Sequence, residues 1–142
     1  MAVWLLKSEP DVYSYGDLVR DKREPWDGVA NPTAQMNMRA MKRGDGAWIY
    51  HSQTDKAIVG LAKIAKGPYQ DPDHPGFTAK GDPKRVLVDV APVKKLAEPI
   101  ELKRLREDGR FEMFPLIRQP RLSVMPVPEE IDAIFRDWAG LG

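Results

Sequence analysis

The sequence predicts an α+β fold in which five or six short strands, mixed or antiparallel, form a barrel-like sheet with small helices packed outside. Stretches of alternating apolar and polar residues recur along the chain, and turn-forming residues bound each of them. The 13 prolines and 11 glycines favour many turns and short elements over a helical bundle. The length of 142 residues is typical of one domain, so we expect residues 1–142 to form a single unit.

The composition narrows the possible classes of protein. The chain has no cysteines, which excludes disulfides and thiolate metal sites and suits a cytoplasmic protein. The N-terminal apolar run is too short for a signal peptide, and no run approaches the roughly 20 apolar residues that a membrane helix needs. The formal net charge is +1, so a nucleic-acid partner needs a local patch and a pocket rather than a global field.

The first expected elements are a strand and a short helix. Val3–Lys7 is an apolar run of strand character, and a proline soon after it ends the strand. Ser14–Arg20 is predicted to be helical because its first residue, a serine, can cap the N-terminus. We expect Leu18 and Val19 to point inward from this helix.

An unusual tryptophan follows. The polar stretch Asp21–Pro25 leads to Trp26, which lies among turn-forming residues rather than inside a strand or helix. Thr33 can then cap a second helix over Ala34–Met41. A tryptophan in such a turn either plugs the end of the core, with no concavity beside it, or forms the wall of a pocket.

The middle of the chain predicts a hairpin and a further strand. Ala47–Ser52 and Ala57–Lys66 alternate in polarity, and Gln53–Lys56 joins them. Gly67–Pro83 is expected to be a long loop, which in a compact domain is usually functional or mobile. Arg85–Val93 alternates again and is the next predicted strand.

The C-terminal part supplies one or two helical turns, a last strand and a final helix. Leu102 and Leu105 mark the helical turns, Arg121–Val127 is the strand, and Pro128 opens the helix at the favoured first position. Trp4 and Trp48 lie inside predicted strands and are expected in the core. The final helix carries an apolar stripe that is also expected to be core, namely Ile131, Ile134, Phe135 and Trp138.

Two groups of residues invite a catalytic or metal interpretation. His51 and Ser52 could suggest nucleophilic catalysis, but neighbours on a strand point to opposite faces and cannot form a dyad with each other. Asp71, Asp73 and His74 are possible metal ligands without a fourth partner nearby, so a solvated acidic turn is expected instead. No phosphate-binding glycine motif is present, and we therefore expect no cofactor and no metal.

A nucleobase pocket fits the remaining features better. Trp26 offers an aromatic wall, Asn31 an amide that can read a base edge, and Tyr69 a second aromatic ring. Lys7 is either plain surface or a contact to a phosphate or a base carbonyl. Cations are scattered around these residues, at Arg20, Lys22, Arg23, Arg39, Lys42, Arg43, Arg118 and Arg121.

These segments resemble the EVE domain family. The matching stretches are WLLKSEP at Trp4–Pro10, WDGV with Asn31 at Trp26–Asn31, YHS at Tyr50–Ser52, GLAKI at Gly60–Ile64, VDV at Val88–Val90 and RQPRLSV at Arg118–Val124. They follow the family's order and span almost the whole chain. The family has a PUA-like fold, barrel-like with peripheral helices, and is related to the YTH readers of methylated adenine. The resemblance implies a binding module for modified nucleobases.

The chain departs from the family pattern after the tryptophan. The family often reads WDGVRNYQARN in this region, and this chain instead has Ala30, Pro32, Thr33, Gln35 and Met36. Two cations and one aromatic ring are therefore absent. This predicts fewer phosphate and stacking contacts from this loop, and a ligand or modification different from that of better-known members.

The leading hypothesis is a cytoplasmic, bacterial-type module that binds a modified base in DNA or RNA without catalysis. The resemblance places its pocket at the segments Lys7–Ser8, Trp26–Asn31 and Tyr50–Ser52. The expected ligand contacts are Lys7, Ser8, Trp26, Asn31, Tyr50, His51, Ser52, Tyr69, Arg118 and Arg121. The alternatives are a hydrolase or nucleotide-processing enzyme that uses His51 or Ser52, and a protein-interaction module with a large exposed apolar patch.

Overall fold

The computed structural model describes residues 1–141 and confirms the α+β, PUA-like architecture. The elements are β1 (Val3–Ser8), α1 (Tyr15–Asp21), β2 (Glu24–Pro25), α2 (Pro32–Ala40), β3 (Gly46–His51), β4 (Ala57–Gln70), β5 (Val86–Glu101), α3 (Leu102–Asp108), α4 (Pro115–Arg118), β6 (Val124–Pro126) and α5 (Glu129–Trp138). Six strands form one sheet in the order β2-β5-β4-β3-β1-β6. Only the β1–β3 pair of this sheet is parallel.

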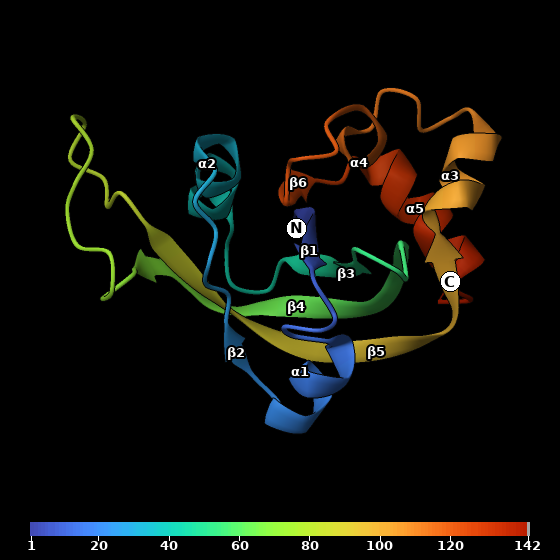
Figure 1. Cartoon of the computed structure of the whole chain (residues 1–142), viewed down its shortest axis with the longest axis horizontal. Coiled ribbons are helices and arrows are strands. Elements are labelled where there is room, and N and C mark those ends of the chain that lie inside the picture. Colours follow the sequence, from blue (N-terminus) through green and yellow to red (C-terminus); the bar gives the residue numbers. More distant parts are fainter. Residues whose placement is uncertain (142) are drawn as a thin grey trace.

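The helices cover different parts of this sheet (Figure 1). Helices α3, α4 and α5 gather at one end, and the loop between β4 and β5 projects from the other. Helix α1 lies beside β5, and α2 lies on the opposite side of the sheet in this view. None of the helices in residues 1–141 has the length and apolar character to cross a membrane.

The two longest strands, β4 and β5, extend further than expected. β4 runs to Gln70 and β5 to Glu101, so the loop between them is confined to residues 71–85. Register shifts between the two strands allow the long hairpin to bend, which is how a sheet curves around a core. Two further corrections concern short strands: β6 is shorter than the expected Arg121–Val127, and β2 was not expected.

The helix ends differ from expectation in their details. Ser14 caps α1 in a reciprocal capping box with Asp17, as expected, but Val19 is 50% exposed and does not point inward. Helix α2 begins two residues earlier than predicted, at Pro32 rather than Ala34, so its cap is Asn31 rather than Thr33. Pro128 is the cap of α5 rather than its first helical residue. A proline fits there because it needs no backbone N–H.

The core is continuous and rich in aromatic rings. Phe135 of α5 is fully buried, stacks on Phe111 at 5.8 Å between ring centroids, and meets Trp48 of β3 edge-on at 5.7 Å. Trp4 and Trp48 are buried as expected. Trp138 is only half-buried, and the Arg104 guanidinium lies over its ring, 3.7 Å from the ring centroid.

Candidate functional site

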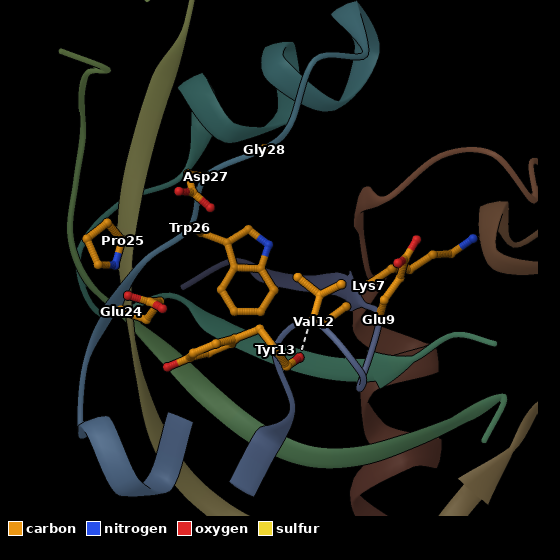
Figure 2. A pocket seen from close by; sticks show the side chains of 10 residues that line it. Lys7, Glu9, Val12, Tyr13, Glu24, Pro25, Trp26, Asp27 and Gly28 are labelled. Carbon is orange, nitrogen blue, oxygen red and sulfur yellow. Dashed lines mark hydrogen bonds between the residues drawn. The ribbon is translucent and has the colours of Figure 1, made fainter. Parts of the chain in front are cut away.

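A cavity of about 430 Å³ lies between two chain segments that are distant in sequence (Figure 2). One segment follows β1 and the other contains β2 and the turn after it. The lining residues are Lys7, Ser8, Glu9, Val12, Tyr13, Glu24, Pro25, Trp26, Asp27 and Gly28. The cavity therefore joins two of the three segments named by the family resemblance, and three of the ten expected contact residues: Lys7, Ser8 and Trp26.

Hydrogen bonds fix the first wall, which is built from residues 7–13. The Ser8 carbonyl accepts the Ser52 N–H at 3.0 Å, which ties the end of β1 to the end of β3. The Tyr13 N–H donates to the Glu9 carbonyl at 2.8 Å and closes a turn. The Ser8 hydroxyl donates to the Tyr13 carbonyl across this turn, as the dashed line in Figure 2 shows. Ser8 thus shapes the wall.

The edge of the sheet fixes the second wall. In β2, Glu24 pairs with Val90 of β5. The Trp26 N–H donates to the Val88 carbonyl at 2.8 Å, so the backbone of Trp26 continues the pairing beyond β2. Gly28 has a φ of +74°, in the left-handed region that favours glycine, and redirects the chain toward α2.

Trp26 is both an enclosed residue and a pocket wall. Its side chain is only 7% exposed, and Tyr13 meets it edge-on at 6.3 Å between ring centroids. Figure 2 shows the indole at the centre of the lining residues, with Tyr13 below it and Val12 beside it. Trp26 is thus as buried as a core residue. The core interpretation also predicted that no concavity lies beside the indole, and that prediction is wrong.

The indole N–H of Trp26 is a free donor. The indole N–H groups of Trp4 and Trp48 donate to the carboxylates of Asp45 and Asp132, at 3.0 and 2.8 Å. Among residues 1–141, the Trp26 Nε1–H has no such acceptor, and it is not sealed from solvent either, because no buried side-chain nitrogen or oxygen lacks a partner. It therefore opens toward the cavity that this side chain lines.

The charges around the cavity are mainly negative. Glu9, Glu24 and Asp27 line it, and none of them takes part in an ion pair within residues 1–141. Burial raises the pKa of the Glu24 carboxyl, and the neighbouring aspartate charges raise it further. The one cation of the lining, Lys7, donates to the Pro120 carbonyl at 2.8 Å, and burial lowers its pKa.

The third segment of the resemblance lies outside this cavity. Tyr50 and His51 are 4% and 7% exposed, and Ser52 donates to the Ser8 carbonyl at 3.3 Å. The His51 Nε2 accepts the backbone N–H of Tyr15 at 2.9 Å, and its Nδ1 lies 3.0 Å from the Asp55 carboxylate. Both ring nitrogens of His51 are therefore engaged by the protein, and neither is free to take a proton from a substrate.

Asn31, Arg118 and Arg121 also lie away from the cavity. The Asn31 side-chain oxygen accepts the Ala34 N–H at 3.0 Å, because Asn31 caps α2. Asn31 and Arg121 line a separate hollow of about 330 Å³, which Thr33 borders as well. Arg118 is exposed and contacts the Met113 sulfur at 3.4 Å. The expectation that Asn31 borders the same cavity as Trp26 is thus wrong, and its part in ligand binding stays a prediction.

Tyr69 is in β4 rather than in a loop. Its hydroxyl donates to the Asp89 carboxylate, and the Lys66 ammonium lies 4.8 Å from the centre of its ring. Burial and the bond to Asp89 raise the pKa of Tyr69 to about 12. The Tyr69 side chain therefore contacts residues of the β4–β5 hairpin, and it does not line the Trp26 cavity.

Two other expectations are resolved by local contacts. Asp71 is 4% exposed and closes its own turn, accepting the Asp73 N–H at 2.9 Å and lying 3.0 Å from the His74 Nδ1. Gln35, where the family often has arginine, is 3% exposed and joins the segment before α2 to the start of β5: it donates to the Val29 carbonyl and accepts the Val86 N–H. This position therefore serves the fold rather than a phosphate.

Sequence reasoning missed several lining residues. Glu9, Val12 and Tyr13 follow the first strand in a turn, and Glu24 and Pro25 belong to the short strand that was not expected. The signal that was available is Tyr13, an aromatic ring in a turn segment, like Trp26.

Comparisons with known proteins agree with this architecture. Residues 2–136 match the model of the EVE domain family. Thymocyte nuclear protein 1 of Mus musculus is 34% identical over 157 residues, which cover 89% of this chain and 69% of that protein. A solved structure from Rhodopseudomonas palustris is 39% identical with a TM-score of 0.88, covering 99% of this chain and 94% of that one.

A third comparison includes a bound nucleic acid. The structure of human THYN1 in complex with DNA that contains 5-methylcytosine is 29% identical to this chain, with a TM-score of 0.87 and 98% of each chain covered. The family match, the shared architecture and the order of the motifs lead to one conclusion: this chain belongs to the EVE domain family.

Proposed function

We propose that this chain is a non-catalytic module that binds a modified nucleobase of DNA or RNA in the cavity beside Trp26. The observation that carries the proposal is the cavity itself, with an indole in its wall, a free indole N–H and unpaired carboxylates. A relative of the same fold, human THYN1, has been crystallised with DNA that contains 5-methylcytosine, which supports a base as ligand.

The size and energetics of the cavity suit a single base. A volume of about 430 Å³ falls within the range of small-molecule sites. Stacking a base on an aromatic side chain contributes about 1–3 kcal/mol, whereas extracting it from a duplex costs a few kcal/mol. Burying one extra methyl group adds about 0.8 kcal/mol, roughly fourfold in affinity. Selectivity for a modified base therefore requires polar contacts as well as burial.

The geometry gives no comparable support to the enzyme alternative. Both nitrogens of His51 are engaged, and Ser52 lies outside the cavity. The discriminating measurement is turnover, with the protein incubated with modified nucleosides and oligonucleotides. Product that persists in Trp26→Leu and vanishes in His51→Ala would favour an enzyme. A cytoplasmic location and a bacterial source stay predictions from the sequence.

The binding test uses variants that keep the core filled. Trp26→Ala would leave a large cavity at a side chain that is 7% exposed, so Trp26→Leu is preferable, because it removes the aromatic face and retains apolar volume. Trp138→Leu, on α5 and outside the cavity lining, is the matched control for losing a tryptophan. Circular dichroism establishes that each variant is folded.

The ligands are single-stranded oligonucleotides that each carry one modified base in a common sequence. We expect wild type and Trp138→Leu to bind at least one of them more tightly than the unmodified strand. Trp26→Leu is expected to weaken that binding by about 5- to 150-fold, which corresponds to the loss of one stacked base. Equal binding by folded Trp26→Leu and wild type would refute the site.

A further inference from the structure

We infer that Glu24 gives this cavity its base specificity: its carboxylate accepts a hydrogen bond from the exocyclic amino group of a cytosine-type base and rejects the carbonyl of a thymine-type base. This inference rests on the proposed function and adds the chemical class of the base and the residue that reads it.

Most charged groups that line the cavity are carboxylates, which need hydrogen-bond donors as partners. The carboxylates of Glu9, Glu24 and Asp27 form no ion pair within residues 1–141, and an ionised carboxylate can only accept hydrogen bonds. The Lys7 ammonium, which could neutralise one of them, instead donates to the Pro120 carbonyl. A ligand that brings hydrogen-bond donors satisfies these groups, and a ligand that brings only acceptors leaves them unpaired.

Glu24 is the best placed of the three carboxylates. Glu9 and Asp27 are exposed, whereas Glu24 is half-buried. The pairing of β2 with β5 holds the backbone of Glu24 in place, so its carboxylate starts from a fixed position. Partial burial makes a hydrogen bond to this carboxylate stronger and makes its absence more costly. Burial raises the pKa of Glu24, which agrees with a carboxylate whose desolvation Tyr13 and Arg20 offset only in part.

Trp26 supplies an independent sign of a ligand. Its indole N–H has no acceptor within residues 1–141, although the side chain is more than nine-tenths buried and lines the cavity. This N–H points along the plane of the indole, so it can donate to an oxygen beside a base that stacks on the ring. The cavity therefore offers a stacking face, a donor at its edge and an acceptor carboxylate.

The two pyrimidines differ in how they meet a carboxylate. Cytosine and 5-methylcytosine carry an amino group at position 4, and one of its hydrogens points toward position 5, away from the ring acceptors. Thymine has a single donor on this edge, its N3–H, which lies between two carbonyl oxygens. Both oxygens approach a carboxylate that accepts from N3–H and repel it. Glutamate and aspartate accordingly accept from the cytosine amino group in nucleic-acid recognition.

The test uses two single strands that differ at one position, 5-methylcytosine in one and thymine in the other. Both bases carry the 5-methyl group, so only the edge at positions 3 and 4 changes, and single strands avoid the cost of opening a duplex. We expect wild type to prefer the 5-methylcytosine strand by about tenfold, as one charge-assisted hydrogen bond at a half-buried site allows.

Three variants assign the preference. Glu24→Gln adds an amide N–H that can donate to a carbonyl. We therefore expect the preference of this variant for the 5-methylcytosine strand to drop to about twofold or less. Glu24→Asp keeps the charge but shortens the side chain by one methylene, and its preference should fall as well. Glu9→Gln removes an exposed charge at the same rim, so it is expected to raise the affinity for both strands equally and to keep the ratio.

The outcomes separate this inference from the proposed function. Equal binding of both strands by wild type, or an unchanged ratio in folded Glu24→Gln, would overturn the role of Glu24 while binding that depends on Trp26 persisted. If neither strand binds while a strand with another modified base does, the inference fails and the proposed function stands. If no modified strand binds, or if Trp26→Leu binds them all as wild type does, the proposed function fails and the inference falls with it.

Discussion

Replacing His51 tests whether this side chain holds the fold together or performs chemistry. The two hydrogen bonds of the ring can be removed one at a time, because a glutamine side chain reaches about as far as Nε2 and an asparagine about as far as Nδ1. His51→Gln can still accept the buried Tyr15 N–H, and His51→Asn can still contact Asp55, which is exposed. His51→Ala removes both contacts.

The burial of the two partners sets the expected order. A buried N–H that loses its acceptor costs about 1–3 kcal/mol, whereas a contact to an exposed carboxylate contributes about 0–1 kcal/mol. We therefore expect His51→Gln to lose less stability than His51→Asn, and His51→Ala to lose the most, about 1–4 kcal/mol in total. For a chain of this length, each kcal/mol corresponds to about 3–5 °C in Tm.

Thermal melting by circular dichroism measures this order, and oligonucleotide titration of the same samples measures function. Binding should persist in folded His51→Gln, because the ring nitrogens of wild-type His51 contact Tyr15 and Asp55 and not the ligand. The reasoning fails if His51→Asn is as stable as wild type while His51→Gln melts like His51→Ala. A His51→Gln variant that stays fully stable and loses all binding would also contradict it.

Three further predictions concern stability. Gly60→Ala places a Cβ 2.3 Å from the buried Tyr15 ring, so we expect the free energy of unfolding in urea to fall by about 1–3 kcal/mol as α1 is displaced. Asp45→Ala removes the acceptor of the buried Trp4 indole N–H, and a drop of about 1–3 kcal/mol by the same assay is expected; no drop would contradict the assignment. Glu24 has a raised pKa in the folded state, so its ionisation disfavours folding as the pH rises through that pKa. Glu24→Gln should therefore melt above wild type at neutral pH, and this advantage should vanish in acid below the usual range of a glutamate carboxyl.

The sequence predicted secondary structure correctly where the signal depends on residues close together in the chain, as alternating polarity and helix caps do. The alternation in Ala57–Lys66 and the serine cap of α1 predicted the right elements, because both depend on neighbouring residues. The two-residue strand β2 has no alternation to detect, since its pairing with β5 is a long-range event. The far half of β5 contains Pro99, which argues against a strand, and its pairing with β4 overrides that local preference.

The candidate site was predictable only in part for the same reason. Lys7, Ser8 and Trp26 follow from strand ends and an isolated tryptophan in a turn. Asn31 was expected at a base edge, but α2 starts two residues earlier than predicted and uses this side chain as its cap. The place of Trp26 in a turn, away from the helical stripe of Trp138, predicts that Trp26→Ala loses less stability than Trp138→Ala. The 7% exposure of Trp26 and the half-buried state of Trp138 predict the reverse order for these two variants.

The position of β1 has a consequence for how the chain folds. This first strand lies between β3 and β6. One of its two partners, β6, therefore comes from near the end of the chain, just before α5. Lys7 also takes its backbone acceptor, the Ser123 carbonyl, from that region. During synthesis, the wall formed by residues 7–13 must wait for a strand that is made more than a hundred residues later. Non-local pairing of this kind slows folding, and a C-terminal truncation before β6 should abolish binding although it removes no residue that lines the cavity.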